Sequence, residues 1–216
     1  MTATNISAPS HPRCEGAFFC PDNSRQQLFL RFDAVGFIRD DNNRKESRQA
    51  MDKSGYTLLP NRTDHKCFGC GPANPAGLQM QFYTNGETVA SWITVPPHLC
   101  GWSNLAHGGI LFTALDEIMG RAMIYLLQRF VLTKSITIEY RKPVPLGREF
   151  KVEGRILEVR SEREAAAEGI ITNDEGEICT RATGLWATFT PDSARKLGIS
   201  DEETFRWFEQ VIATKR

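Results

Sequence analysis

The sequence predicts an α+β domain in which an antiparallel β-sheet wraps around one long central α-helix. Two observations lead to this prediction. Residues 110–127 repeat apolar side chains at helical spacing, over a stripe wide enough to be buried on most sides. A hairpin pattern precedes this helix and a succession of alternating runs follows it. Runs of strands before and after a single buried helix are typical of an α+β fold.

The hairpin pattern comes from two short alternating runs, residues 77–82 and 89–93, with Asn85-Gly86 between them. Asn-Gly between such runs is the strongest short-range hairpin signal in a sequence. After the helix, apolar and polar side chains alternate again, and Asp174-Glu-Gly176 supplies a turn before the last run. The strands predicted after the helix are residues 135–140, 150–159, 165–172 and 178–189.

The ends of the chain differ from this central part. The tail repeats apolar residues at helical spacing after Ser200, and Glu203 would complete a capping box, so we predict a short helix packed on the outside. The predicted organisation has three parts: a loop-rich N-terminal extension at 1–57 with a possible strand or hairpin at 28–38, the α+β domain at 58–191, and a helical tail at 192–216.

Composition and charge exclude several classes of protein. The chain has 216 residues, of which 41% are hydrophobic and 24% charged, so it is not wholly disordered. Lys+Arg and Asp+Glu both count 26, and with no net charge we expect no nucleic-acid partner. No apolar run approaches the roughly 20 residues of a membrane helix. The N-terminus lacks the apolar core of a signal peptide, so the expected compartment is the cytoplasm.

Six cysteines need an interpretation, and in a cytoplasmic chain we expect reduced thiols. Cys67-Phe-Gly-Cys70 has the spacing of two ligands of a zinc knuckle, and His65 is close by. A structural zinc site needs two further ligands, and no second pair with this spacing follows. Other cysteines and histidines could supply them only if the chain folded back. We therefore expect an ordinary turn with buried thiols, no metal site and no cofactor.

Asp116 is the most informative residue of the predicted helix. At about 100° per residue, Glu117, Arg121 and Gln128 form a stripe that should face water, where Glu117 and Arg121 are placed to pair. Asp116 lies roughly 100° or more from the middle of that stripe, among apolar and small residues. Burying a carboxylate is costly without a partner or a purpose. Asp116 is therefore either a catalytic group or a structural residue bonded to backbone amides or an arginine.

His107-Gly-Gly109 stands immediately before the helix. The amides of Gly108 and Gly109 are unpaired donors at its positive end, where they could hold a carbonyl oxygen and stabilise an oxyanion. Asp116 lies about 10–12 Å further along the same axis, so one subunit would struggle to bring both groups to one carbonyl. A dimer with two such helices antiparallel could do so. The alternative for His107 is a structural hydrogen bond within its loop.

Three motifs in this order resemble the hotdog-fold acyl-CoA thioesterases, in particular the subgroup with the phenylacetate-pathway and thioesterase-superfamily-member enzymes. They are the segments Cys67 to Leu78, His107 to Asp116 and Thr133 to Gly147. The resemblance covers about residues 67–189. It implies a hotdog fold and an acyl-CoA substrate. It also implies a homodimer or a dimer of dimers, with active sites at the subunit interface.

The resemblance also implies roles for single residues. Gly108 would polarise the thioester carbonyl through its amide, and Asp116 would attack directly or activate water. Thr133 would orient that water. Many relatives carry an asparagine where this chain has Gly101. The residues expected to contact the substrate are His107, Gly109, Asn104, Arg141 and Lys142. Asn104 could replace the missing asparagine. The charges of Arg141 and Lys142 suit the phosphates of CoA, and the alternative is that they are ordinary solvated surface charges.

Two other functions remain possible from the residues. Hotdog dehydratases pair a histidine with an acid about fourteen residues later, but Phe112 follows His98 at that distance and Arg121 follows His107. A non-catalytic acyl-CoA sensor or interaction module is the second alternative. Release of free thiol from a panel of acyl-CoA substrates would separate these functions from a thioesterase.

Overall fold

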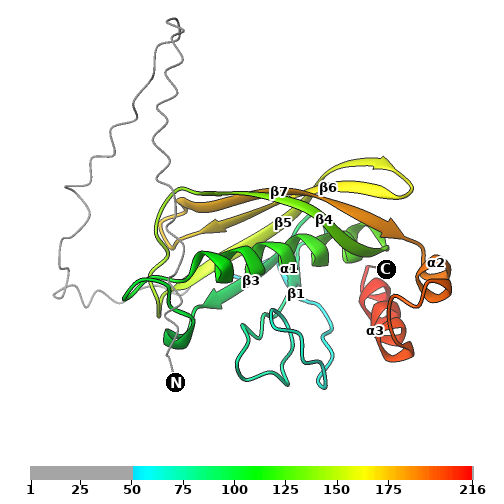
Figure 1. Cartoon of the computed structure of the whole chain (residues 1–216), viewed down its shortest axis with the longest axis horizontal. Helices are drawn as coiled ribbons and strands as arrows, with labels where there is room; N and C mark the ends of the chain where they lie inside the picture. Colours follow the sequence, from blue (N-terminus) through cyan, green and yellow to red (C-terminus); the bar gives the residue numbers. More distant parts are fainter. Residues whose placement is uncertain (1–50, 216) are drawn as a thin grey trace, which may run out of the picture. The chain divides into compact units, whose positions relative to one another are not determined.

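The computed structural model describes residues 51–215, and its core is a single sheet wrapped around the helix α1, Gly108–Leu127 (Figure 1). Seven antiparallel strands lie in the order β1-β2-β3-β5-β6-β7-β4. Their bounds are Thr57–Leu58 for β1, Tyr83–Thr84 for β2, Val89–Thr94 for β3, Phe130–Tyr140 for β4, Glu149–Ser161 for β5, Glu164–Thr172 for β6 and Ile178–Phe189 for β7. The predicted α+β class and the helix in the sheet are confirmed. The segment 28–38 lies outside the described residues.

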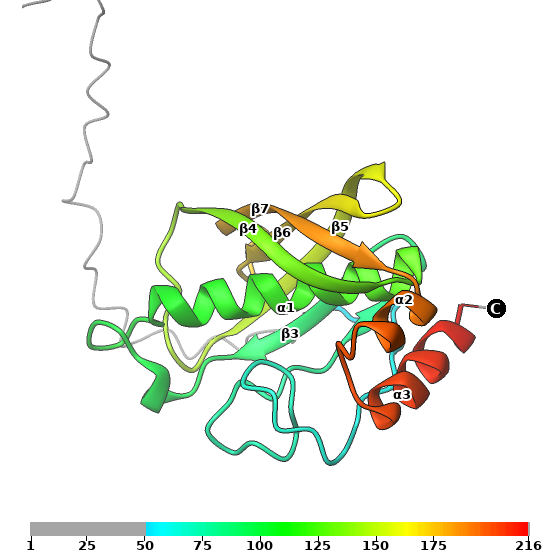
Figure 2. The ribbon, with the colours of Figure 1, turned by 45° about the vertical axis from the view of Figure 1, so that its right-hand side comes forward.

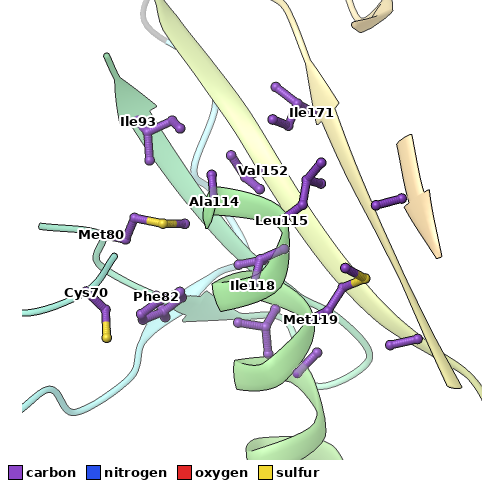
Figure 3. Close-up of a cluster of buried hydrophobic side chains, with 14 of the residues drawn as sticks. Cys70, Met80, Phe82, Ile93, Ala114, Leu115, Ile118, Met119, Val152 and Ile171 are labelled. Atoms are coloured by element: carbon purple, nitrogen blue, oxygen red, sulfur yellow. The ribbon is translucent and has the colours of Figure 1, made fainter. Parts of the chain in front are cut away.

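Helix α1 lies on the concave face of the sheet and contacts β3, β4, β5 and β6. Leu115, Ile118 and Met119 point from α1 toward the sheet, where Val152 of β5 and Ile171 of β6 pack close to them (Figure 3). All five of these residues are fully buried. The wide apolar stripe read from the sequence is thus the face that fills the sheet.

Two glycines allow α1 to approach this closely. A Cβ atom at Gly154 in β5 would lie 2.7 Å from the carbonyl oxygen of Ile118, and one at Gly169 in β6 would lie 2.9 Å from a methyl carbon of Leu115. Gly154 and Gly169 face each other in the ladder between β5 and β6. The absence of side chains at these two positions therefore sets the distance between helix and sheet.

The hairpin before the helix is only partly as predicted. Asn85 makes the turn, because its Oδ1 accepts hydrogen bonds from the amides of Glu87 and Thr88, and Gly86 has φ +93°. However, β2 is only two residues long, and residues 77–82 do not form the predicted strand. They pair with the preceding loop instead: the Met80 amide donates to the Gly69 carbonyl. A tertiary partner thus replaces the expected hairpin arm.

The C-terminal tail forms α2, Pro191–Lys196, and α3, Glu202–Ala213. The predicted cap at Ser200 is wrong by one residue, because Asp201 accepts a hydrogen bond from the Thr204 amide at 2.8 Å. The tail helix packs on the outside of the domain as expected. Phe208 of α3 stacks on Phe130 at the start of β4, with ring centroids 4.4 Å apart. Figure 2 shows α3 beside the last turns of α1.

The prediction that Glu117 and Arg121 face water is wrong. Arg121 is only 5% exposed, and its guanidinium carbon lies 4.2 Å from the ring centroid of Phe82 and 4.4 Å from that of Trp207. The loop from residue 59 to 82 and the helix α3 cover this side of α1 (Figures 1 and 2). Among the described ion pairs, none joins Glu117 to Arg121. Of the three residues in the predicted stripe, only Gln128, the C-cap of α1, is exposed.

Candidate active site

Asp116 and Thr133 form the centre of the candidate site. Thr133 lies on β4, and its hydroxyl donates a hydrogen bond of 2.8 Å to Oδ1 of Asp116. The register of β4 against β7 shifts between Thr133 and Ser135, an irregularity that can redirect a side chain at a sheet edge. Asp116 is half-buried, and this burial raises the pKa of its carboxyl, while the bond from Thr133 lowers it. The structure thus brings together two residues that the sequence analysis singled out separately.

The start of α1 provides the second part of the site. His107 is the N-cap, and its Nδ1 accepts a hydrogen bond of 2.9 Å from the Gly109 amide. The amides of Ile110 and Leu111 donate to the His107 carbonyl. Within the described residues, the Gly108 amide has no hydrogen-bond partner. His107 thus makes the structural hydrogen bond that was its alternative, the Gly109 amide donates to this cap, and the Gly108 amide is the free donor at the helix start.

Tyr140, at the end of β4, is a residue whose role the sequence analysis missed. Its hydroxyl donates a hydrogen bond of 2.9 Å to the Gly108 carbonyl. A Cβ atom at Gly108 would lie 3.3 Å from that hydroxyl oxygen. Tyr140 thus fixes the peptide next to the free amide. The alternating pattern of residues 135–140 gave no sign of this contact, because Gly108 lies 32 residues away from Tyr140 in the chain.

The free amide and the carboxylate are separated along one helix. Gly108 and Asp116 are eight residues apart in α1, which corresponds to about 12 Å along its axis. A carbonyl carbon and its oxygen span little more than about 1.2 Å. Even with a contact of about 3 Å at each end, one chain would have difficulty placing both groups on the same carbonyl.

The predicted substrate contacts lie near the helix start, with partners of their own. Arg141 pairs with Glu139 at 2.7 Å, and Lys142 pairs with Glu177. Asn104 is exposed, and its backbone oxygen accepts a bond from the Leu146 amide. Since Arg141 and Lys142 directly follow Tyr140, these exposed cations lie close to the end of α1 that carries Gly108.

A second cluster of reactive groups lies on the other side of α1. The sulfur atoms of Cys67 and Cys70 and a carboxylate oxygen of Glu117 all lie within 4.8 Å of one another. Burial raises the pKa of Glu117 to about 7. Glu117 was expected to face water, and its place beside the two cysteines was not predicted. The signal that could have joined them is absent from local spacing, because Glu117 is 50 residues from Cys67.

An α+β domain with one long helix wrapped by an antiparallel sheet is a hotdog fold, and comparisons with known proteins show which family it resembles. Residues 103–179 match the family model described as "Thioesterase superfamily". Over these residues the chain is similar to the thioesterase superfamily. A solved structure described as a thioesterase superfamily protein superposes with a TM-score of 0.53 at 21% identity, covering 58% of this chain and 60% of that one. At this identity the likeness shows the fold alone.

Two curated relatives carry a functional name. Acyl-coenzyme A thioesterase THEM4 of Xenopus laevis is 27% identical over 111 residues, which cover 51% of this chain and 50% of that protein. The protein of the same name from Rattus norvegicus is 30% identical over 95 residues, covering 44% and 40%. The chain thus spans about half the length of the curated relatives it matches. Among the described helices, none is long and apolar enough to cross a membrane.

Proposed function

We propose that this protein is an acyl-CoA thioesterase in which Asp116 is the catalytic carboxylate. The observation that carries the proposal is the Asp116–Thr133 hydrogen bond on a helix whose Gly108 amide is free. A carboxylate held in a half-buried position by a hydroxyl can act as a general base or a nucleophile. A free amide at the positive end of a helix suits an oxyanion. The functional name of the two relatives supports the same reaction.

The reaction would run through a tetrahedral intermediate. Asp116 removes a proton from a water molecule held with Thr133, and the water oxygen attacks the thioester carbonyl carbon. Alternatively, the carboxylate attacks first and water hydrolyses the resulting anhydride. In either case the negative charge develops on the carbonyl oxygen, where the Gly108 amide stabilises it. The carbon–sulfur bond then breaks, and the products are a carboxylic acid and the free thiol of CoA.

We further propose that the two halves of the site come from two copies of the chain. Within the described sheet, β4 pairs only with β7, so its outer edge is open. Leu132 on β4 and Phe112 on α1 are 49% and 38% exposed, which leaves apolar surface beside that edge. An open edge with apolar surface favours pairing with another strand. A twofold axis there would run two α1 helices antiparallel and bring Gly108 of one copy to Asp116 of the other.

The phosphates of CoA would lie near the exposed cations. Arg141 and Lys142 are candidates because they stand close to the helix start, although each has a carboxylate partner that a phosphate would have to replace. Asn104 is exposed in the loop before His107 and is free to contact the substrate through its side chain. The acyl group would extend from the thioester toward the interior of the proposed interface.

The decisive experiment replaces Asp116 by asparagine, with Asp174→Asn in an exposed turn as the matched control. Loss of a general base lowers turnover by roughly 10²–10⁴-fold. Because burial raises the pKa of Asp116, its ionised form costs stability above that pKa, so the variant should melt at or above the wild-type temperature at neutral pH. Free thiol release from an acyl-CoA panel and the melting temperature are measured on the same preparation.

Several outcomes would contradict the proposal. An Asp116→Asn protein that keeps more than about a tenth of wild-type turnover has no catalytic carboxylate at this position. A variant that loses stability and retains its turnover per folded molecule assigns Asp116 a structural role. Sedimentation that shows an active monomer would refute the shared site. Binding of acyl-CoA with no thiol release by the wild type would favour a sensor module instead.

A further inference from the structure

A thiol pair with no part in the proposed hydrolysis lies against α1. Cys67 and Cys70 are both free thiols, and their sulfur atoms lie within 4.8 Å of each other. The turn that joins them is tight, because the Gly71 amide donates to the Cys67 carbonyl at 3.0 Å. A Cβ atom at Gly71 would lie 2.4 Å from the Cys67 amide nitrogen, so no other residue fits there. The fold thus keeps the two sulfurs within 4.8 Å of each other, and a disulfide of about 2.05 Å requires them to approach further.

The two cysteines differ in exposure, as the two members of a redox pair do. Cys67 is half-buried and reachable from solvent, whereas Cys70 is 4% exposed. Cys70 lies beside Met80 and Phe82 in the core (Figure 3). An accessible thiol that attacks and a buried thiol that resolves are typical of reversible thiol oxidation.

The hydrogen bonds around the pair favour a thiolate on Cys67. Hydrogen bonding from the Cys70 thiol, and from backbone amides of the turn, lowers the pKa of Cys67 to about 5. The Cys67 sulfur lies 3.1 Å from Oε1 of Glu117, and burial together with that negative sulfur raises the pKa of Glu117 to about 7. The guanidinium of Arg121 lies near the cluster, and His65 lies 3.9 Å from the Cys70 sulfur.

The arrangement suits a redox pair better than a metal ion. Among the described residues only three ligating atoms come within 4.8 Å of one another, whereas a structural zinc site uses four. The cluster also has its own buried cation, since Arg121 is 5% exposed and its Nη1 has no hydrogen-bond partner in the described chain. The positive charge of Arg121 can balance the negative charge of the Cys67 thiolate, so the cluster does not require a divalent cation for charge balance.

We propose that Cys67 and Cys70 form a reversible intramolecular disulfide by exchange with low-molecular-weight disulfides such as glutathione disulfide. The Cys67 thiolate attacks one sulfur of glutathione disulfide, forms a mixed disulfide and releases one glutathione thiolate. Cys70 then passes its proton to Glu117, and its sulfur attacks the Cys67 sulfur and expels the second glutathione thiolate. Glu117 then releases this proton to solvent, and the two glutathione thiolates each take up one proton. In total, two protein thiols are oxidised and one glutathione disulfide is reduced to two thiols.

Oxidation would reach the helix that carries Asp116. The thiolate and the carboxyl of Glu117 are in contact in the reduced form, and the disulfide removes that contact and its negative charge. Glu117 directly follows Asp116, and its charge is one of the influences that raise the pKa of Asp116. The thiol pair is thus connected to the candidate site through one residue of α1.

The test uses the full chain in glutathione buffers with an increasing ratio of oxidised to reduced glutathione. Samples are quenched with acid and unfolded, remaining thiols are alkylated, and peptide mass spectrometry reports each cysteine. We expect Cys67 and Cys70 to lose their label together and to regain it with dithiothreitol. In Cys70→Ser, Cys67 should accumulate a glutathione adduct. In Cys67→Ser, Cys70 should stay labelled. Cys179→Ser, which changes another buried cysteine, is the matched control and should behave as wild type.

A kinetic measurement adds a second criterion. At pH 6 Cys67 has a higher thiolate fraction than Cys179, although each thiolate of low pKa is a weaker nucleophile. We therefore expect the alkylation of Cys67 to be at least about 10-fold faster than that of Cys179. Full labelling of both thiols at every glutathione ratio would overturn the proposal. Stoichiometric zinc that copurifies with the wild type and is lost in Cys67→Ser would also overturn it, in favour of a metal site. Neither result depends on thioesterase activity, so it leaves the proposed function untouched.

Discussion

Replacing Gly154 by alanine should separate α1 from the sheet. The added Cβ would lie 2.7 Å from the Ile118 carbonyl oxygen, 3.0 Å from its carbon and 3.3 Å from the Met119 amide nitrogen. All three are backbone atoms of α1, so no side-chain rotation can relieve the contact. Ordinary van der Waals contact begins at 3.4 Å, so helix and strand must move apart by about 0.7 Å or distort locally.

The expected cost follows from this displacement. Overpacking in a well-packed core costs about 1–3 kcal/mol. For a domain of this size, each kcal/mol corresponds to roughly 2–4 °C, so the melting temperature should fall by about 2–12 °C. Gly120→Ala is the matched control, because a Cβ there meets only one Val131 methyl carbon at 3.9 Å. Within a helix, alanine is more favourable than glycine by about 1 kcal/mol, so the control should gain stability.

Thermal and urea unfolding of both variants at one protein concentration would measure these changes of opposite sign. If Gly154→Ala melts at or above the wild-type temperature, the close approach of α1 and β5 does not limit the packing of the core. If both variants lose stability equally, the effect belongs to glycine replacement in general. Either result would refute the geometric argument.

Two further variants test single hydrogen-bonded groups. Thr133→Val removes the donor to Asp116. A hydrogen bond to a charged group contributes about 1.5–3 kcal/mol, so turnover at neutral pH should fall roughly 10–150-fold, and the acid limb of the pH profile should move to higher pH. An unchanged profile would show that the hydroxyl has no effect on the carboxylate. Glu168 of β6 is 3% exposed; burial acts to raise its pKa, but hydrogen bonds from Arg181 and Arg155 outweigh burial and lower it. Its carboxylate therefore stabilises the fold above the unfolded pKa of about 4.3, and this contribution is lost as the pH falls through the lower folded value. Glu168→Gln should thus cost about 1–3 kcal/mol at pH 7, less near pH 3, as urea unfolding at both pH values would show; an equal cost at both values would contradict an ionic role.

Periodicity along the chain predicted the elements that local sequence controls. The apolar spacing of residues 110–127 identified α1 almost to its ends, and alternation identified β4, β5, β6 and β7. Asp116 and Gly108 became candidates in the same way, because a carboxylate among apolar residues and glycines before a helix are visible in the sequence itself. These features depend on neighbours one to four residues apart.

Only the tertiary structure decided which surfaces of α1 are covered. Glu117 and Arg121 occupy positions that a lone amphipathic helix would expose, but the loop bearing Cys67 and the helix α3 bury them. The Tyr140–Gly108 bond likewise joins positions that no local pattern relates. Helical spacing reports which side chains share a face, whereas burial depends on what folds against that face. That partner can come from anywhere in the chain.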